Sequence, residues 1–197
     1  MNRSADISRS PIHIASAIHS LIGGAGSVGG PAHAARMTDP QTIAWLDQGD
    51  AHLAQVIRTH RWSVQFVGAG VAPGEPPFGY TVGLFGLGHA ELVVVGLEPD
   101  GVHGILDRAA RLVADGRDLV AGELLSWPDW PDLRLVVEEL PNPGEVLLVA
   151  NRFYERPAEY SLPAYQLTWA LPGHGFPWED DGQADPELQP RPGRWRA

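Results

Sequence analysis

The feature that most constrains the fold is a pair of β-prone segments, residues 78–84 and 89–96, separated by the four residues Phe85-Gly86-Leu87-Gly88. Short loops that contain glycine join neighbouring antiparallel strands, because glycine adopts the backbone angles that a tight reversal needs. The segments therefore predict a β-hairpin. A chain with this hairpin near its middle needs a sheet around it and helices to cover that sheet.

The hairpin predicts its own register. If the loop closes symmetrically, with Leu84 opposite His89, then Tyr80 lies opposite Val93. Side chains alternate between the faces of a strand, so His89 and Glu91 are expected on one face, with Tyr80 beside them. A slip of one residue would put Thr81 in the place of Tyr80.

Hydrophobic periodicity and turn residues predict the remaining elements. Helices are expected at about 40–59 and from Pro99 to a glycine cap at 116. Strands are expected at 62–66, 133–139 and 164–170. The segment Asn142-Pro143-Gly144-Glu145 resembles a helix start, so a short helix is expected after it, although 145–149 also fits a strand.

These elements predict an α+β fold: an antiparallel or mixed sheet of about five strands, with two to three helices packed on it and a loop-rich C-terminus. The 23 glycines and 18 prolines agree with many turns. The glycine-rich residues 1–36 are expected to be a disordered extension, 37–192 a single domain and 193–197 a tail.

The composition limits the classes of partner that the protein is expected to bind. The formal net charge is −10, and all 14 basic residues are arginine. A surface with this excess of negative charge is expected to repel phosphate backbones and anionic membranes. We therefore predict no nucleic-acid partner and no membrane partner. No apolar run reaches the roughly 20 residues that span a bilayer. Without cysteine there is no disulfide or thiolate site, and a cytoplasmic location is expected. Nothing in the sequence fixes a cofactor or an oligomeric state.

The densest group of reactive side chains falls in the hairpin. Tyr80 or Thr81, with His89 and Glu91, can supply a proton donor, a base and a carboxylate that orients the imidazole. The same groups can instead satisfy one another as a buried hydrogen-bond network. The residues alone leave both interpretations open.

No metal-specific spacing is present. His89-Ala90-Glu91 has the His-x-Glu start of the zinc deaminase motif, but that motif needs cysteine ligands, which the chain lacks. A site of histidine and carboxylate ligands would draw on His60, His89 and Glu91. We predict no metal site, and keep these three residues as its candidates.

The chain contains seven tryptophans. Trp127 and Trp130 stand in Ser-Trp-Pro-Asp-Trp-Pro, which is typical of a loop packed over a core as a lid, and less often of a pocket wall. Trp178, in Phe-Pro-Trp-Glu, allows the same two interpretations.

Seven segments form an ordered set: His60-Arg61-Trp62, 77–84, 88–92, Asn151-Arg152-Phe153-Tyr154, 165–169, 175–179 and Gln189-Pro190. Taken together, they resemble the uncharacterised bacterial family called domain of unknown function 4262, over about residues 40–192. The resemblance implies no known reaction, cofactor or partner, but it suggests a shared site. Ala90 stands where the family usually has proline, and Arg61 where glycine is common.

Two classes of function follow. The leading hypothesis is a binding module that holds a small polar ligand or a peptide in a pocket on the sheet; its residues would be Tyr80, His89, Glu91, Gln166, Trp169 and Trp178. The alternative is a hydrolase-like or metal-assisted enzyme using His89 and Glu91, with Tyr80 or Thr81 as proton donor. A structural or interaction protein with a buried polar network is the third interpretation.

Overall fold

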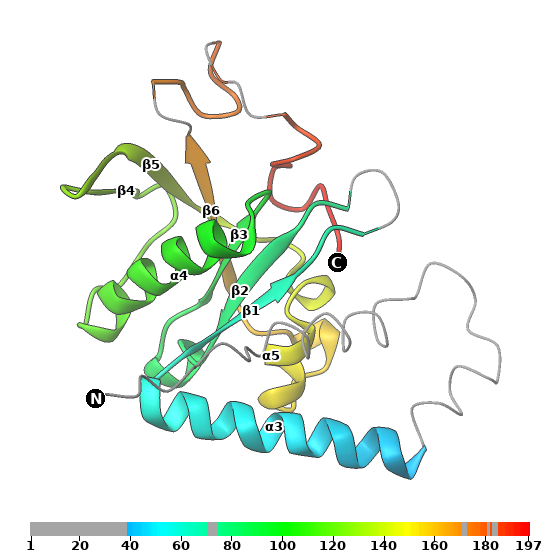
Figure 1. Ribbon diagram of the computed structural model, residues 1–197. Helices are drawn as coiled ribbons and strands as arrows, with labels where there is room; N and C mark the ends of the chain where they lie inside the picture. Colours follow the sequence, from blue (N-terminus) through cyan, green and yellow to red (C-terminus); the bar gives the residue numbers. More distant parts are fainter. Residues whose placement is uncertain (1–38, 71–74, 171–172, 181, 183–184) are drawn as a thin grey trace, which may run out of the picture.

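The computed structural model describes residues 39–70, 75–170, 173–180, 182 and 185–197. Over these residues the fold is α+β, with a mixed sheet of six strands in the order β1-β2-β3-β6-β5-β4 and three α-helices (Figure 1). The strands are β1 (Ser63–Val67), β2 (Phe78–Val82), β3 (Glu91–Val95), β4 (Leu124–Trp127), β5 (Trp130–Glu139) and β6 (Ala164–Ala170). The helices are α3 (Pro40–His60), α4 (Pro99–Ala114) and α5 (Leu148–Phe153).

The sheet consists of two antiparallel groups joined at its centre. β1, β2 and β3 pair antiparallel in chain order, as do β4, β5 and β6, whereas β3 and β6 run parallel. The predicted hairpin register is confirmed, because Tyr80 pairs with Val93.

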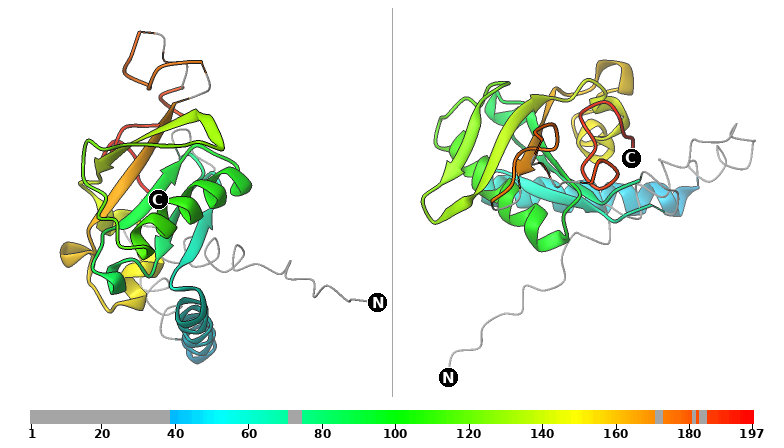
Figure 2. Two further views of the ribbon diagram at one scale, coloured as in Figure 1. Left: turned by 90° about the vertical axis from the view of Figure 1, so that its left-hand side faces the viewer. Right: turned by 90° about the horizontal axis from the view of Figure 1, so that it is seen from above.

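Helices cover the two faces of the sheet unequally. α4 lies across β1, β2 and β3 on one face, while α3 and α5 lie on the other (Figures 1 and 2). α4 turns one apolar stripe toward the sheet, including Ile105, Leu106 and Ala109, as its helical spacing predicts. α3 and α5 bury residues that include Leu53 and Val149. These residues form the second core together with Phe78 and Tyr80.

α3 forms where the sequence predicts it. The carboxylate of Asp39 accepts a hydrogen bond from the Thr42 amide at 3.3 Å, and Pro40 occupies the first turn, so both start signals are used. Only part of the expected apolar stripe is buried: Leu46 and Leu53 lie in the core, whereas Ile43 is exposed. The packed part of the helix is therefore its middle and its C-terminal half.

The sixth strand corrects the interpretation of the tryptophan loop. Leu124–Trp127 forms β4, and Trp127 pairs with Trp130 across Pro128 and Asp129, so the segment is a β-hairpin and not a lid. The sequence-based count of five strands missed it because proline and tryptophan obscure the alternation of this short edge strand. The hairpin packs on α4, where the guanidinium of Arg108 lies 4.3 Å from the centre of the Trp130 ring.

The third helix is present but short. Pro143–Glu145 forms a 3₁₀ turn and α5 follows at Leu148, so the strand alternative for 145–149 is not realised. Asn142 does not cap the helix; its side-chain amide donates to the carboxylate of Glu145 and to the carbonyl of Trp195, each at 2.9 Å. The expected capping residue thus ties α5 to the end of the chain.

The C-terminal segment, defined as residues 185–197, packs on the face that carries α5 (Figures 1 and 2). Trp195 is buried in the core, with its ring centre 4.9 Å from that of Phe78, and its indole N–H donates to the Gln166 side chain at 3.0 Å. Residues 193–197 are expected from the sequence to form a tail, whereas Trp195 is packed in the core. The expected disordered extension, 1–36, lies outside the described residues, among which no helix is long and apolar enough to cross a membrane.

Replacing Trp195 tests whether the C-terminal segment belongs to the folding unit. Trp195→Ala removes a buried ring and is expected to lower the free energy of unfolding by about 3 kcal/mol or more, measured by urea denaturation. Trp45→Ala on α3 is the control, because Trp45 is 36% exposed and a change within about 0.5 kcal/mol is expected. Equal, small changes in both variants would contradict the packing of this segment.

Candidate functional site

The carboxyl group of Glu91 organises the hairpin turn. Glu91 is the first residue of β3 and has no exposed surface. It accepts hydrogen bonds from the Thr81 hydroxyl at 2.6 Å and from the amides of Gly83 at 2.9 Å, Phe85 at 3.1 Å and Leu84 at 3.3 Å. The Thr81 hydroxyl in turn accepts from the Leu92 amide at 2.9 Å. Both oxygens of Glu91 are therefore occupied by the turn that precedes its own strand.

Glycine at position 83 makes this arrangement sterically accessible. Gly83 has a φ of +133°, and a Cβ atom there would lie 2.5 Å from the carbonyl oxygen of Arg61. A larger residue would be strained in backbone conformation and would also force the two chains apart. The close approach lets the amides of Gly83, Leu84 and Phe85, the last of them the first residue of the 3₁₀ turn Phe85–Leu87, converge on one carboxyl group.

Burial raises the pKa of the Glu91 carboxyl to about 7, because removal from water penalises the charged form more than its hydrogen bonds stabilise it. The largest opposing contribution comes from the Thr81 hydroxyl, followed by the turn amides. A carboxyl group with such a pKa suits acid-base chemistry, but this one is enclosed by donors of its own chain.

His89 is not joined to Glu91. Its Nε2 accepts a hydrogen bond from the Leu119 amide at 3.1 Å, and its Nδ1 lies 2.6 Å from the Ala90 carbonyl, which requires the proton on Nδ1. The ring is buried and meets Tyr165 edge-on. One ring nitrogen thus bonds to the chain at Leu119 and the other to the carbonyl of Ala90, and the predicted His89–Glu91 pair is not formed among the described contacts.

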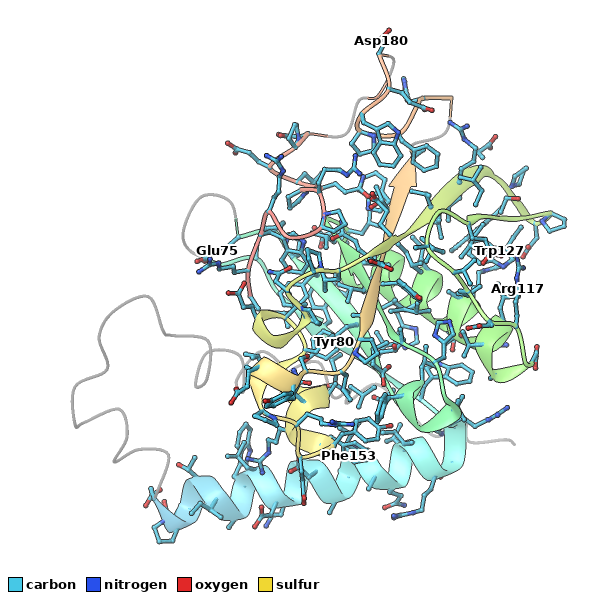
Figure 3. The ribbon with its side chains drawn as sticks, turned by 180° about the vertical axis from the view of Figure 1, so that it is seen from behind. Glu75, Tyr80, Arg117, Trp127, Phe153 and Asp180 are labelled. Carbon is cyan, nitrogen blue, oxygen red and sulfur yellow. The ribbon has the colours of Figure 1, made fainter. Side chains whose placement is uncertain are left out.

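Tyr80 lies inside the core that includes Val93 and residues of α5. It has no exposed surface, its hydroxyl accepts from the Val149 amide of α5 at 3.2 Å, and desolvation raises the pKa of its phenol above the ordinary value. Figure 3 shows Tyr80 inside the molecule, well away from Asp180 at the tip of the loops that follow β6. Tyr80 therefore links β2 to α5.

Gln166 and Trp169 bind the C-terminal segment instead of forming a pocket floor. The Gln166 amide donates to the Pro190 carbonyl at 2.9 Å while its oxygen accepts from Trp195. The amide group and the carbonyl of Trp169 both bond to the side chain of Gln189, at 2.7 and 2.9 Å. Gln189 thus behaves like a neighbouring strand for β6, and it explains why Gln189-Pro190 stands out in the sequence.

Trp178 is 45% exposed, but both faces of its ring are covered. Phe176 stacks on one face at 4.9 Å between ring centres and 4° between planes, and the Arg191 guanidinium lies 4.2 Å from the ring centre. The Arg134 guanidinium lies 5.2 Å from the centre of the Phe176 ring. This stack fixes Arg191 above β5, where its guanidinium also donates to Glu138 at 2.5 Å.

The structure does not assemble the metal candidates. His60 is at the exposed end of α3, whereas His89 and Glu91 are buried and separately bonded. Within the described residues no three histidine, cysteine, aspartate or glutamate side chains gather closely enough to hold an ion.

An open groove of about 750 Å³ lies beside the C-terminal segment, on residues that the sequence analysis did not select. Its floor is β5, where Val136 and Glu138 share the face not covered by α4. One wall is the turn at Ala121 and Gly122. The remaining lining residues are Pro141, Arg191, Pro192 and Arg194.

His89 and Gln166, which the sequence singled out, and Thr168, which it did not, hold the segments that line the groove. His89 anchors Leu119, two residues before Ala121. Gln166 anchors Pro190, next to Arg191, and the Thr168 hydroxyl donates at 2.6 Å to Glu138, which binds Arg191. These are positioning residues that act through the main chain, and no signal in the sequence connects them to the groove, because their partners lie 24 to 30 residues away.

A smaller hollow of about 410 Å³ lies between α4 and Trp127. Its charged residues are already paired: Arg108 forms two hydrogen bonds with Asp129, and Arg111 bonds to Asp107. The larger groove on β5 is therefore the better candidate site, because the charged side chains of the smaller hollow are already paired.

A family model described as a domain of unknown function, DUF4262, matches residues 56–183. The chain belongs to the DUF4262 family. Comparison with curated proteins and with solved structures found no match. The matched region of the DUF4262 chain contains Thr81, His89 and Glu91, whereas Arg191 and Arg194 of the groove lie beyond it.

The raised pKa of Glu91 in this DUF4262 protein predicts a specific pH dependence. The folded-state pKa of about 7 exceeds the ordinary value of 4.5, so the stability linked to this group is present below about pH 4 and is lost as the pH rises through 7. Wild type is expected to lose about 3 kcal/mol relative to Glu91→Gln between pH 4 and pH 8. Urea unfolding of both proteins across this range measures it, and a constant difference would contradict the prediction.

Thr81→Val tests the hydroxyl that links Glu91 to β3. The change removes a donor to the carboxyl group and an acceptor for the Leu92 amide. The free energy of unfolding is therefore expected to fall by about 1–3 kcal/mol. Thr81→Ser keeps the hydroxyl and is expected to retain most of this stability. If thermal and urea denaturation place the valine variant level with the serine variant, the hydroxyl has no such role.

Proposed function

We propose that the protein is a binding module that holds a peptide or a small polar ligand in the groove on β5. The single observation that carries the proposal is a cavity of about 750 Å³ on β5, lined by strand and loop residues and by none from a helix, with the loops on either side of its lining held by hydrogen bonds to Leu119 and Pro190. Volumes of this size are usual for ligand sites, and preformed walls reduce the entropy lost on binding.

The chemistry of the lining supports this proposal. Val136, Pro141 and Pro192 offer apolar surface, while Arg194 and the main chain of β5 offer polar contacts. This mixture of apolar walls and a few fixed polar groups is typical of specific ligand sites. The His89 and Glu91 side chains, by contrast, already have hydrogen-bond partners, so an acid-base mechanism through them has less support.

Blocking the groove tests the proposal. Wild type would be screened by phage display of random linear peptides and by thermal shift against a collection of small polar compounds. Ala121→Trp fills the groove from an exposed rim position, and Ala51→Trp, exposed on α3, is the matched control.

At least one ligand is expected to bind wild type and Ala51→Trp equally and Ala121→Trp at least about tenfold more weakly, a loss of about 1.4 kcal/mol of binding free energy. Two outcomes would overturn the proposal: neither screen yields a ligand, or every ligand binds Ala121→Trp as well as it binds the control.

A further inference from the structure

The groove contains an unpaired positive charge. Among the 11 arginines in the described part of the chain, nine bond to a carboxylate or a carbonyl or lie over an aromatic ring; the exceptions are Arg58 and Arg194. Arg58 is exposed on α3, whereas Arg194 lines the groove. A guanidinium presents a planar fork of donors that matches a carboxylate in two parallel hydrogen bonds.

The acidic residues of the groove leave Arg194 uncompensated. Glu138 shares its two oxygens between Arg191 and the Thr168 hydroxyl, so its charge is already balanced. Side chains alternate along β5, and the groove face carries Val136 and Glu138, so the side chain of Glu139 belongs to the opposite face. Glu139 therefore contributes main chain to the groove.

The main chain at Glu139 is available for strand pairing. The Leu140 amide bonds to Ala164 of β6, so the N–H and C=O of Glu139 point to the other side, toward the line of β4. Val137, which points the same way, is bonded by Gly122 and Glu123. Before Gly122 the chain turns away, in a turn closed by the Glu123 amide and the Val120 carbonyl at 3.1 Å. The strand position next to Glu139, on the side of β4, therefore opens into the groove.

We propose that the ligand is an extended peptide that pairs with β5 at Glu139 and places a carboxylate on Arg194. This inference rests on the proposed function and names the class of ligand for that groove. The strand line supplies main-chain hydrogen bonds, the apolar walls contact side chains, and Arg194 selects the anionic group. The carboxylate comes from the C-terminus of the peptide or from an aspartate or glutamate side chain.

The test uses fluorescein-labelled mixtures of random hexapeptides, with binding followed by fluorescence polarisation. One mixture has free C-termini and no acidic side chains, the second has amidated C-termini and one aspartate, and the third is amidated with asparagine in that place. Arg194→Gln is compared with Arg58→Gln, which removes the same charge from an arginine that is also unpaired and exposed.

At least one carboxylate mixture is expected to bind about tenfold more tightly than the asparagine mixture, as one charge-assisted hydrogen-bonded pair implies. Arg194→Gln is expected to abolish this preference and Arg58→Gln to keep it. Whichever carboxylate mixture binds more tightly identifies the source of the group. N-methylation of the peptide backbone is expected to weaken binding about tenfold, since it removes a donor to β5.

Binding that is blocked by Ala121→Trp, yet shows no carboxylate preference or tolerates N-methylation, would overturn this inference and leave the proposed function intact. Absence of any groove-dependent ligand, peptide or small molecule, would overturn both.

Discussion

The hydrogen bonds to the Glu91 carboxyl group are the interaction on which the rest of the structure depends. They tie the amides of residues 83–85 and the Thr81 hydroxyl to the first residue of β3, and so fix the hairpin at one end of the central strands. β3 is the strand that joins the two antiparallel groups through its parallel pairing with β6. A buried acid in this place is costly unless its oxygens are satisfied, so the turn and the strand specify one another.

The other buried polar side chains extend this frame to the loops. Tyr80 bonds to the Val149 amide of α5, His89 bonds to the Leu119 amide, and Gln166 bonds to the Pro190 carbonyl. Each of these bonds joins a side chain on or next to the central strands to the main chain of a helix or a loop that packs beside them. Polar groups of this kind stabilise little on average, but leaving one unsatisfied is expensive, so they select a single arrangement of the loops. That arrangement brings Ala121 and Arg194 into the lining of one groove.

Local patterns were enough to predict much of the fold. The symmetric loop at 85–88 indicated the Tyr80–Val93 register, and Asp39-Pro40 indicated the start of α3, because both depend on neighbours in sequence. β4 was missed because Pro128 and the two tryptophans resemble a loop when their partner strand is unknown. The site was harder to predict: the sequence cannot distinguish a polar residue that faces a ligand from one that faces an amide 30 residues away, as His89 does. Arg194 carried no signal, since only the fold shows that it lacks a partner.

Amide hydrogen exchange at Gly83, Phe85 and Leu119 tests most directly whether the polar motif is the frame of the fold. These amides donate to Glu91 and His89, so they are expected to exchange only through global unfolding, with the protection of the β3 core, even though they lie in loops. Protection as low as that of ordinary exposed loop amides would contradict the account, because the carboxyl and imidazole groups would then be free for other roles.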